Sequence, residues 1–137
     1  MFGNTHNAIS AYQKVSVDAA VEVADPYRLI LLLFEGALAA IGTARSAMQQ
    51  AKVAERGVAI SKAIDIISNG LKASLDQEKG GTLASQLDAL YDYMITRLLQ
   101  ANLKNDEKAL EEVSFLLGEI YSAWREIAPA KLKQDAA

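Results

Sequence analysis

Apolar side chains recur at helical spacing along most of the chain, and strand-like alternation is almost absent between its two prolines, Pro26 and Pro129. Residues three or four apart share one face of an α-helix, so this spacing predicts helices. The run LILLLF at 29–34 goes further, because six consecutive apolar residues extend around every side of a helix. A surface helix needs only one apolar stripe. This run therefore predicts a helix that other elements, or a partner, cover on several sides.

Two helices are expected in the first half of this stretch. The first begins at Asp25-Pro26, because Asp is a favoured N-cap and Pro suits the first helical position, and it continues to about residue 51. The second covers roughly 55–78. No Pro or Gly lies between 50 and 55, so a break there is expected only because a compact domain needs a turn.

A third helix is expected after the pair Gly80-Gly81, since consecutive glycines mark a turn. Thr82 then caps this helix, which covers about 82–103.

A fourth helix is expected over about 106–127, with Asn105 or Asp106 as its N-cap. Pro129 ends it, and residues 129–137 are expected to form a flexible tail.

Four helices joined by short turns predict an all-α fold, an antiparallel four-helix bundle over residues 25–128. A chain of 137 residues corresponds to one domain. Residues 1–24 are mostly polar and rich in Ala, and they predict an additional short N-terminal helix or an extended segment.

Composition excludes several kinds of site. The chain is 51% hydrophobic and 23% charged, which suffices for a core, and it has no Cys for disulfides or cysteine–zinc sites. With a net charge of −3 and scattered Lys and Arg, it is not expected to bind nucleic acid. The N-terminus does not resemble a signal peptide, and the apolar run 29–42 is shorter than the roughly 20 residues of a membrane span. We expect a cytoplasmic protein without membrane insertion.

Candidate catalytic groups are few. His6 is the single histidine, so the usual nucleophile–base pairs cannot be assembled. Asp88 and Asp92 share one helix face, which is interpreted as a solvated face rather than an acid–base pair. The inward Glu-x-x-His pairs of metal-binding bundles are absent. We therefore expect no enzyme, no cofactor and no metal site.

The first three helices carry more apolar surface than one core consumes. One interpretation is a generously packed core with a few exposed leucines. The other is an apolar groove that holds a helix of a partner protein. The N-terminal segment around Ile9, Tyr12 and Val15 then either shields this groove, docks permanently, or is disordered.

Several stretches of the chain match a known pattern. SLDQEKGGTLASQLDALYDYM (74–94) contains a Leu-Asp, a Gly-Gly and a Leu-Tyr-x-Tyr-Met element in this order, and DPYRLILLLFEGAL (25–38) precedes it as a long apolar helix. Both stretches resemble the corresponding parts of the FliS family of flagellar export chaperones. AYQKVSV (11–17), LLQANLKND (98–106) and the region of Trp124 extend the resemblance over the whole chain.

Two features depart from the family pattern. Phe34 stands where many members have Tyr, and the stretch between Tyr12 and Pro26 is longer than in many members.

The resemblance implies a function. FliS proteins bind the disordered C-terminal segment of flagellin in the cytosol as it folds around the bundle, prevent its premature polymerisation and deliver it to the flagellar type III export machinery. The family's N-terminal segment covers part of the groove and moves aside. The alternative for this chain is a structural bundle that self-associates, as in a homodimer, without a chaperone role.

The resemblance also guides the choice of partner-binding residues, which periodicity alone does not make. They are apolar positions of the N-terminal segment and of the second and third helices: Ile9, Tyr12, Val15, Ile64, Ile67, Leu71, Leu87, Tyr91, Met94 and Leu98. Asn102 is expected either to bond partner backbone groups or to cap its own helix.

Overall fold

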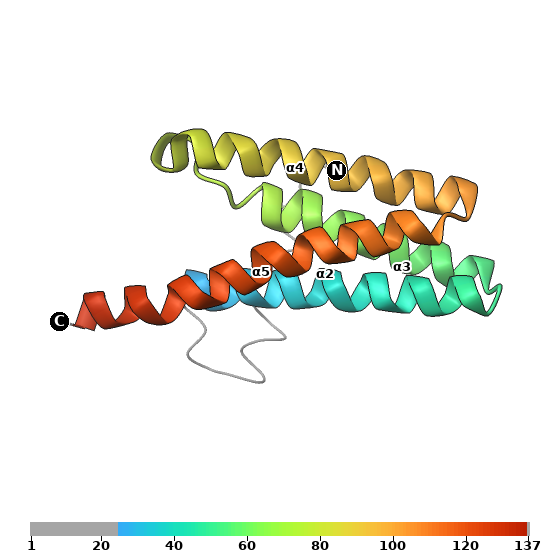
Figure 1. The fold of residues 1–137 in the computed structure, drawn as a ribbon, viewed down its shortest axis with the longest axis horizontal. Coiled ribbons are helices and arrows are strands. Elements are labelled where there is room, and N and C mark those ends of the chain that lie inside the picture. The colour runs from blue at the N-terminus through green and yellow to red at the C-terminus, as the bar shows by residue number, and fades with distance from the viewer. Residues whose placement is uncertain (1–24, 137) are drawn as a thin grey trace.

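The computed structural model describes the backbone of residues 25–136 and the side chains of residues 25–127. The elements are α2 (Pro26–Gln49), α3 (Val53–Asp65), the π-helix η1 (Ile66–Lys72), α4 (Gln77–Lys104) and α5 (Glu107–Ala136). Successive long helices run in opposite directions and lie side by side (Figure 1), and the described residues contain no strand. The predicted all-α antiparallel bundle is confirmed. The expected N-terminal element, with Ile9, Tyr12 and Val15, lies outside the described residues.

The first helix starts as predicted. The Asp25 carboxylate accepts a hydrogen bond from the backbone N–H of Tyr27 at 2.9 Å, and Pro26 occupies the first helical turn. The helix stops at Gln49, and Ala51 then adopts a left-handed conformation with φ of 57°. A residue with a Cβ adopts this conformation at some cost, and for that reason the sequence did not mark the turn.

The second helix ends earlier than expected, at Lys72 instead of about 78, and its last seven residues form a π-helix. A π-turn holds more residues than an α-turn, so it changes which side chains face inward. Ile66, Ile67, Gly70 and Leu71 are all buried as a result.

The third helix starts earlier than expected. Asp76, and not Thr82, caps it by accepting hydrogen bonds from the backbone N–H groups of Glu78 (3.1 Å) and Lys79 (3.0 Å). The predicted glycine turn is a kink inside α4, where Gly81 has φ of 52° and ψ of −128°. Glycine tolerates this conformation because it has no Cβ.

The connection between the third and fourth helices follows the prediction closely. Asn105 ends α4 in the left-handed conformation, with φ of 53°. Asp106 caps α5 by accepting from the backbone N–H groups of Lys108 (3.0 Å) and Ala109 (3.3 Å). The C-terminal end of α5 differs from the prediction. The helix continues past Pro129 to Ala136 instead of ending near residue 127.

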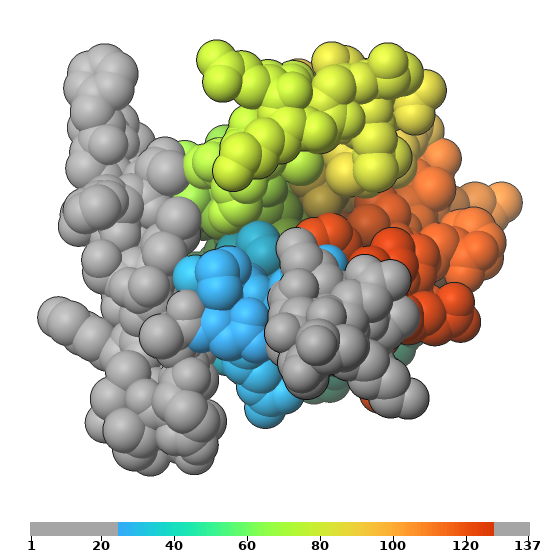
Figure 2. Space-filling view, turned by 90° about the vertical axis from the view of Figure 1, so that its left-hand side faces the viewer, coloured from blue at the N-terminus to red at the C-terminus, as the bar shows by residue number. Residues whose placement is uncertain are grey.

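The core lies between all four helices. α2 packs against α3, η1 and α5, while α4 packs against α3, η1 and α5, so α2 and α4 lie diagonally across the bundle. Figure 2 views the bundle from the end that carries the start of α2 (blue), the kink of α4 (yellow-green) and the later turns of α5 (red). The largest fully buried side chains come from every helix: Phe34, Leu33, Ile41, Ile60, Ile66, Ile67, Met94, Leu98, Leu110, Leu117 and Val113.

α2 is the most apolar helix, and among the described helices it alone is long and apolar enough to cross a membrane by length and composition. The core helix of a soluble protein passes the same test. Here the helix packs into the bundle, with buried residues from Leu33 to Met48.

Glycine substitutions test the close packing of η1 against α2. A Cβ added at Gly70 would lie 2.9 Å from Cδ2 of Leu33, which is fully buried and has no room to move away. We expect Gly70→Ala to lower the free energy of unfolding by about 1–3 kcal/mol, as overpacking does. Chemical denaturation followed by circular dichroism measures the change.

Gly42→Ala in α2 is the matched control. A Cβ there meets nothing within 4 Å. Because alanine is the better helix former, this variant should gain about 0.5–1 kcal/mol. Equal effects of the two substitutions would show that η1 is not packed as described.

Candidate functional site

Five of the predicted partner-binding residues lie in the core. Ile67, Leu71, Tyr91, Met94 and Leu98 are each at most 3% exposed. η1 carries the first two and α4 the other three, and the neighbouring helices enclose them, so in this structure they do not line a surface groove. Their role in partner binding stays a prediction. Burial also raises the pKa of the Tyr91 phenol to about 12, since a phenolate is poorly solvated there.

Two further predicted residues, Ile64 and Leu87, are partly buried and pack against the core. They lie at its edge, where a partner has access to part of each side chain.

Asn102 joins two helices. Its side-chain oxygen accepts from Nε of Arg56 at 3.1 Å, and its backbone carbonyl accepts from another nitrogen of the same guanidinium at 3.1 Å. Arg56 also donates to the side-chain oxygen of Asn105 at 2.6 Å. Asn102 therefore ties α4 to α3. It is not the helix cap, which is Asn105.

The carboxylate pair noted in the sequence has a structural partner. Nζ of Lys72 in η1 lies 3.1 Å from Asp88 and 3.6 Å from Asp92 of α4. The hydrogen bond with Asp88 is the main cause that raises the pKa of Lys72 above its usual range. All three side chains are partly exposed, so the cluster is a surface ion pair between helices.

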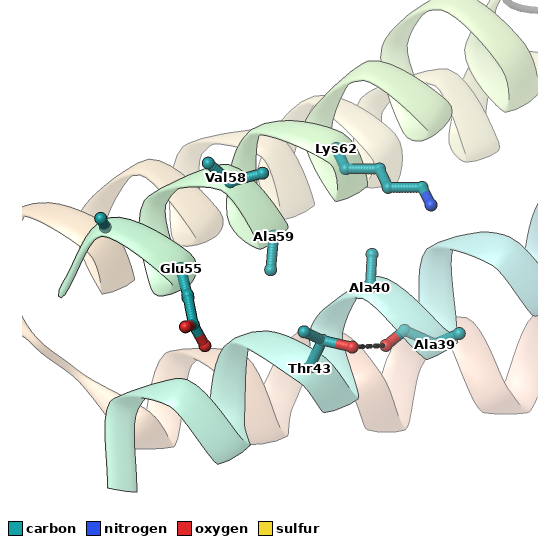
Figure 3. A pocket seen from close by; sticks show the side chains of 8 residues that line it. Ala39, Ala40, Thr43, Glu55, Val58, Ala59 and Lys62 are labelled. Atoms are coloured by element: carbon teal, nitrogen blue, oxygen red, sulfur yellow. Dashed lines mark hydrogen bonds between the residues drawn. The ribbon is translucent and has the colours of Figure 1, made fainter. Parts of the chain in front are cut away.

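A hollow in the described surface lies between α2 and α3. It has a volume of about 440 Å³. We call it the α2/α3 groove. Figure 3 shows its lining side chains, three from α2 and five from α3: Ala39, Ala40, Thr43, Ala54, Glu55, Val58, Ala59 and Lys62.

The floor of this groove is made of small side chains. Ala40 and Ala59 are buried beneath it, while Val58 stands 72% exposed at its side. The Thr43 hydroxyl donates to the Ala39 carbonyl at 3.1 Å (Figure 3), so its proton is used within the helix. Because the side chains are short, a partner helix can approach both helix backbones closely.

Charged groups stand at the rim. Glu55 and Lys62 are seven residues apart on α3, which is about two turns or roughly 10 Å along the helix. Both are exposed. Residues 25–127 hold no group of three or more His, Cys, Asp or Glu side chains suited to a metal. The arrangement is therefore suited to binding an amphipathic helix.

A second hollow continues this surface across α3 to Asn102. Ala54 and Val58 line both hollows. Val53 is 63% exposed beside it, and on α4 Leu99 and Leu103 are 52% and 83% exposed. Sequence reasoning missed this surface because alanines and single valines do not stand out from a core pattern. In the sequence, the available signal was the position of Val58 between Ala54 and Ala59, and the structure shows that its side chain is exposed.

Comparison with known proteins decides the family. The family model for flagellar protein FliS matches residues 8–131. The chain belongs to the FliS family. It is 54% identical to the flagellar secretion chaperone FliS of Salmonella typhimurium, over 96% of this chain and 98% of that protein.

More distant FliS proteins agree. The chain is 50% identical to FliSB of Pseudomonas aeruginosa, over 85% of this chain and 92% of that protein. It is 32% identical to FliS of Bacillus subtilis, over 93% and 90% of the two chains. The resemblance found in the sequence is confirmed, and membership of FliS supports a role as a flagellar export chaperone.

A charged substitution distinguishes core from surface in this FliS protein. Met94 is fully buried, so Met94→Asp places a carboxylate in the core, and we expect it to abolish cooperative folding. Leu103→Asp, at an 83% exposed position of the same helix, should change stability by no more than about 0.5 kcal/mol. Thermal unfolding by circular dichroism compares them. A well-folded Met94→Asp protein would restore Met94 to the partner-binding surface.

Proposed function

We propose that this chain binds the disordered C-terminal segment of flagellin in the cytoplasm, prevents its premature polymerisation and presents it to the flagellar type III export machinery. In this proposal the α2/α3 groove holds a helix that the segment forms on binding. Two observations support it: the family of the chain, and an exposed apolar groove whose floor is made of alanines.

The shape of the groove fits a helical partner. Helix-in-groove recognition uses an apolar face with anchors three and four residues apart. A side chain lying over Ala40 and Ala59 would contact Val58 from the side. The continuation across α3 toward Leu99 offers further apolar surface, which suits a long segment that wraps around the bundle.

The energetics permit such binding. A large apolar side chain contributes roughly 1.5–3 kcal/mol when fully buried. Ordering a disordered segment costs about 2–5 kcal/mol or more. A handful of anchors along the groove and its continuation therefore outweighs the cost of folding the partner.

The protein acts by binding, in this proposal, and not as an enzyme. One proposal from the sequence completes this function, and one competes with it. The N-terminal segment, through Ile9, Tyr12 and Val15, covers the groove until the partner arrives. Self-association through the same apolar surface is the competing function, and concentration-dependent mass in the absence of flagellin would favour it.

Titration calorimetry with the C-terminal segment of flagellin from the same organism, a peptide of roughly 40–60 residues, tests the main proposal. We expect tight binding with a large negative heat-capacity change, because apolar surface is buried as the peptide folds. Val58→Asp should weaken binding more than tenfold without loss of helical signal, since Val58 is 72% exposed. Leu83→Asp, at a 64% exposed position near the kink of α4, is the matched control and should bind normally.

Unchanged affinity of Val58→Asp would remove the α2/α3 groove from the proposal. Absence of binding by the unmodified protein would contradict the flagellin-binding function itself.

Deletion of residues 1–18 tests the covering segment. We expect the shortened protein to keep its helical signal and its cooperative unfolding, because the core comes from residues 33–117. Its affinity for the flagellin peptide should rise or stay the same, since a competitor for the groove has been removed. Loss of folding would show instead that the segment is part of the structure.

A further inference from the structure

The outer face of α5 carries an exposed aromatic ring among carboxylates. Phe115 is 65% exposed, the only described phenylalanine left open to solvent in this way. Glu111 and Glu119 lie one helical turn on either side of it, and both are exposed. Between residues 107 and 127, α5 has five acidic and two basic side chains, a net charge of −3.

This face is separate from the α2/α3 groove. α5 packs against both α2 and α4, and α3 packs against the same two helices from the other side, so α5 and α3 lie diagonally (Figure 1). Phe115 points away from the core positions Val113 and Leu117, which are fully buried. A ligand on the outer face of α5 therefore leaves Val58, on α3, accessible.

Part of the negative charge is already neutralised within the bundle. Glu111 lies 3.2 Å from a guanidinium nitrogen of Arg45. Glu112 accepts from Nε of Arg97 at 2.6 Å and from the hydroxyl of Tyr93 at 2.7 Å. The bond of Glu111 joins α5 to α2, and the bonds of Glu112 join α5 to α4, so α5 is held by polar contacts on both sides of its outer face.

Other carboxylates are available to a ligand. Among residues 25–127, Glu119 and Glu126 form no ion pair. They lie four and eleven residues after Phe115, which is the same stripe of the helix. Within the described residues, the stripe thus presents an aromatic ring followed by two carboxylates that form no ion pair.

The neighbouring aromatic residue widens the apolar surface. Tyr93 of α4 is 43% exposed. Its hydroxyl donates a hydrogen bond to Glu112, and Glu112 precedes Phe115 by three residues on α5. A single exposed apolar side chain is ordinary in a soluble protein. Two exposed aromatic rings, Tyr93 bonded to Glu112 and Phe115 one turn further along α5, give a partner more than one apolar contact on this side of the bundle.

Gly118 is a separate observation that points to a ligand beside Phe115. A Cβ at this position would meet nothing within 4 Å, so the fold itself does not require glycine there. Glycine in the middle of a helix is destabilising relative to alanine. It follows Phe115 by three residues and leaves open space beside the ring, which allows a ligand side chain to approach the backbone of α5.

We propose that the outer face of α5 around Phe115 is a second docking surface, which binds a cationic amphipathic helix of a protein other than the export substrate. An apolar residue of that helix contacts Phe115 and lies over Gly118, while Lys or Arg residues one turn away pair with Glu119 and Glu126. A cation near the ring face of Tyr93 or Phe115 adds a cation–π contact.

Charge complementarity selects this occupant over two others. A second copy of the chain docked through the same face would bring the carboxylates of both copies together. An anionic lipid surface would be repelled for the same reason. A basic helix meets the opposite sign of charge at Glu119 and Glu126.

A peptide titration of the full-length protein tests the proposal. The probe is a synthetic helical peptide of about 18 residues, five turns, with Leu on one face and Lys on the other. A peptide with Glu in place of Lys is its counterpart. We expect the Lys peptide to shift amide NMR signals of residues 111–126 and of Tyr93, with an affinity that falls as salt rises. The Glu peptide should not bind.

Three variants locate the contact. Phe115→Ser and Glu119→Gln should each lower the affinity for the Lys peptide by about fivefold or more. Gly118→Ala should raise the melting temperature and still lower the affinity for the Lys peptide. Replacement of a glycine with only a structural role would not produce this combination. Leu103→Ser, which removes an exposed apolar side chain from α4, is the matched control and should bind normally.

The proposal does not depend on flagellin binding, because Val58→Asp should leave the affinity for the Lys peptide unchanged. Shifts confined to the α2/α3 groove, equal binding of the Glu peptide, or unaltered affinity of Phe115→Ser would each overturn it. So would a concentration-dependent dimer that Phe115→Ser dissociates, since the face would then bind a second copy.

Discussion

The close contact between Leu33 of α2 and Gly70 of η1 is the constraint on which the rest of the bundle depends. A Cβ at position 70 would lie 2.9 Å from the side chain of this fully buried leucine, so glycine allows the two helices to approach closely. The contact brings α2 directly against η1, and the wide π-turn then directs Ile66, Ile67 and Leu71 inward together. α4 and α5 close the opposite sides, so the interior is filled by large side chains from every helix.

This packing decides where a partner can bind. Much of the apolar surface that exceeded the needs of one stripe is consumed inside the bundle: Leu33 and Phe34 are buried, and the other residues of the run 29–34 are partly covered. The accessible apolar surface along α2 and α3 is made mainly of small residues, with Val58 at their edge, and further large apolar side chains are exposed on α4 and α5. In the proposed function, this surface holds its partner by close backbone approach over alanines more than by deep pockets for large side chains.

Polar contacts at the rim of the bundle set the register of the helices. Arg56 joins α3 to the end of α4, Arg97 joins α4 to α5 through Glu112, and the Tyr121 hydroxyl joins α5 to Glu35 of α2 at 2.5 Å. Exposed pairs of this kind stabilise a fold only slightly, by roughly 0–1 kcal/mol each. Their geometry nevertheless holds each helix in one position along its neighbour, which keeps both outer surfaces in a defined shape.

The sequence by itself determined the fold class, the number of long helices and the cap at Asp25, because these follow from local spacing and local hydrogen bonding. It narrowed the cap of the fourth helix to Asn105 or Asp106, and its motifs resemble those of the family to which the chain belongs. Only the tertiary structure decided that Met94 and Leu98 face the core and that Val58 faces solvent. Spacing shows that residues share a face of a helix, but which neighbour covers that face depends on how closely two helices approach. Here that distance depends on a glycine and a leucine 37 residues apart, Gly70 and Leu33, and nothing local to either one reports it.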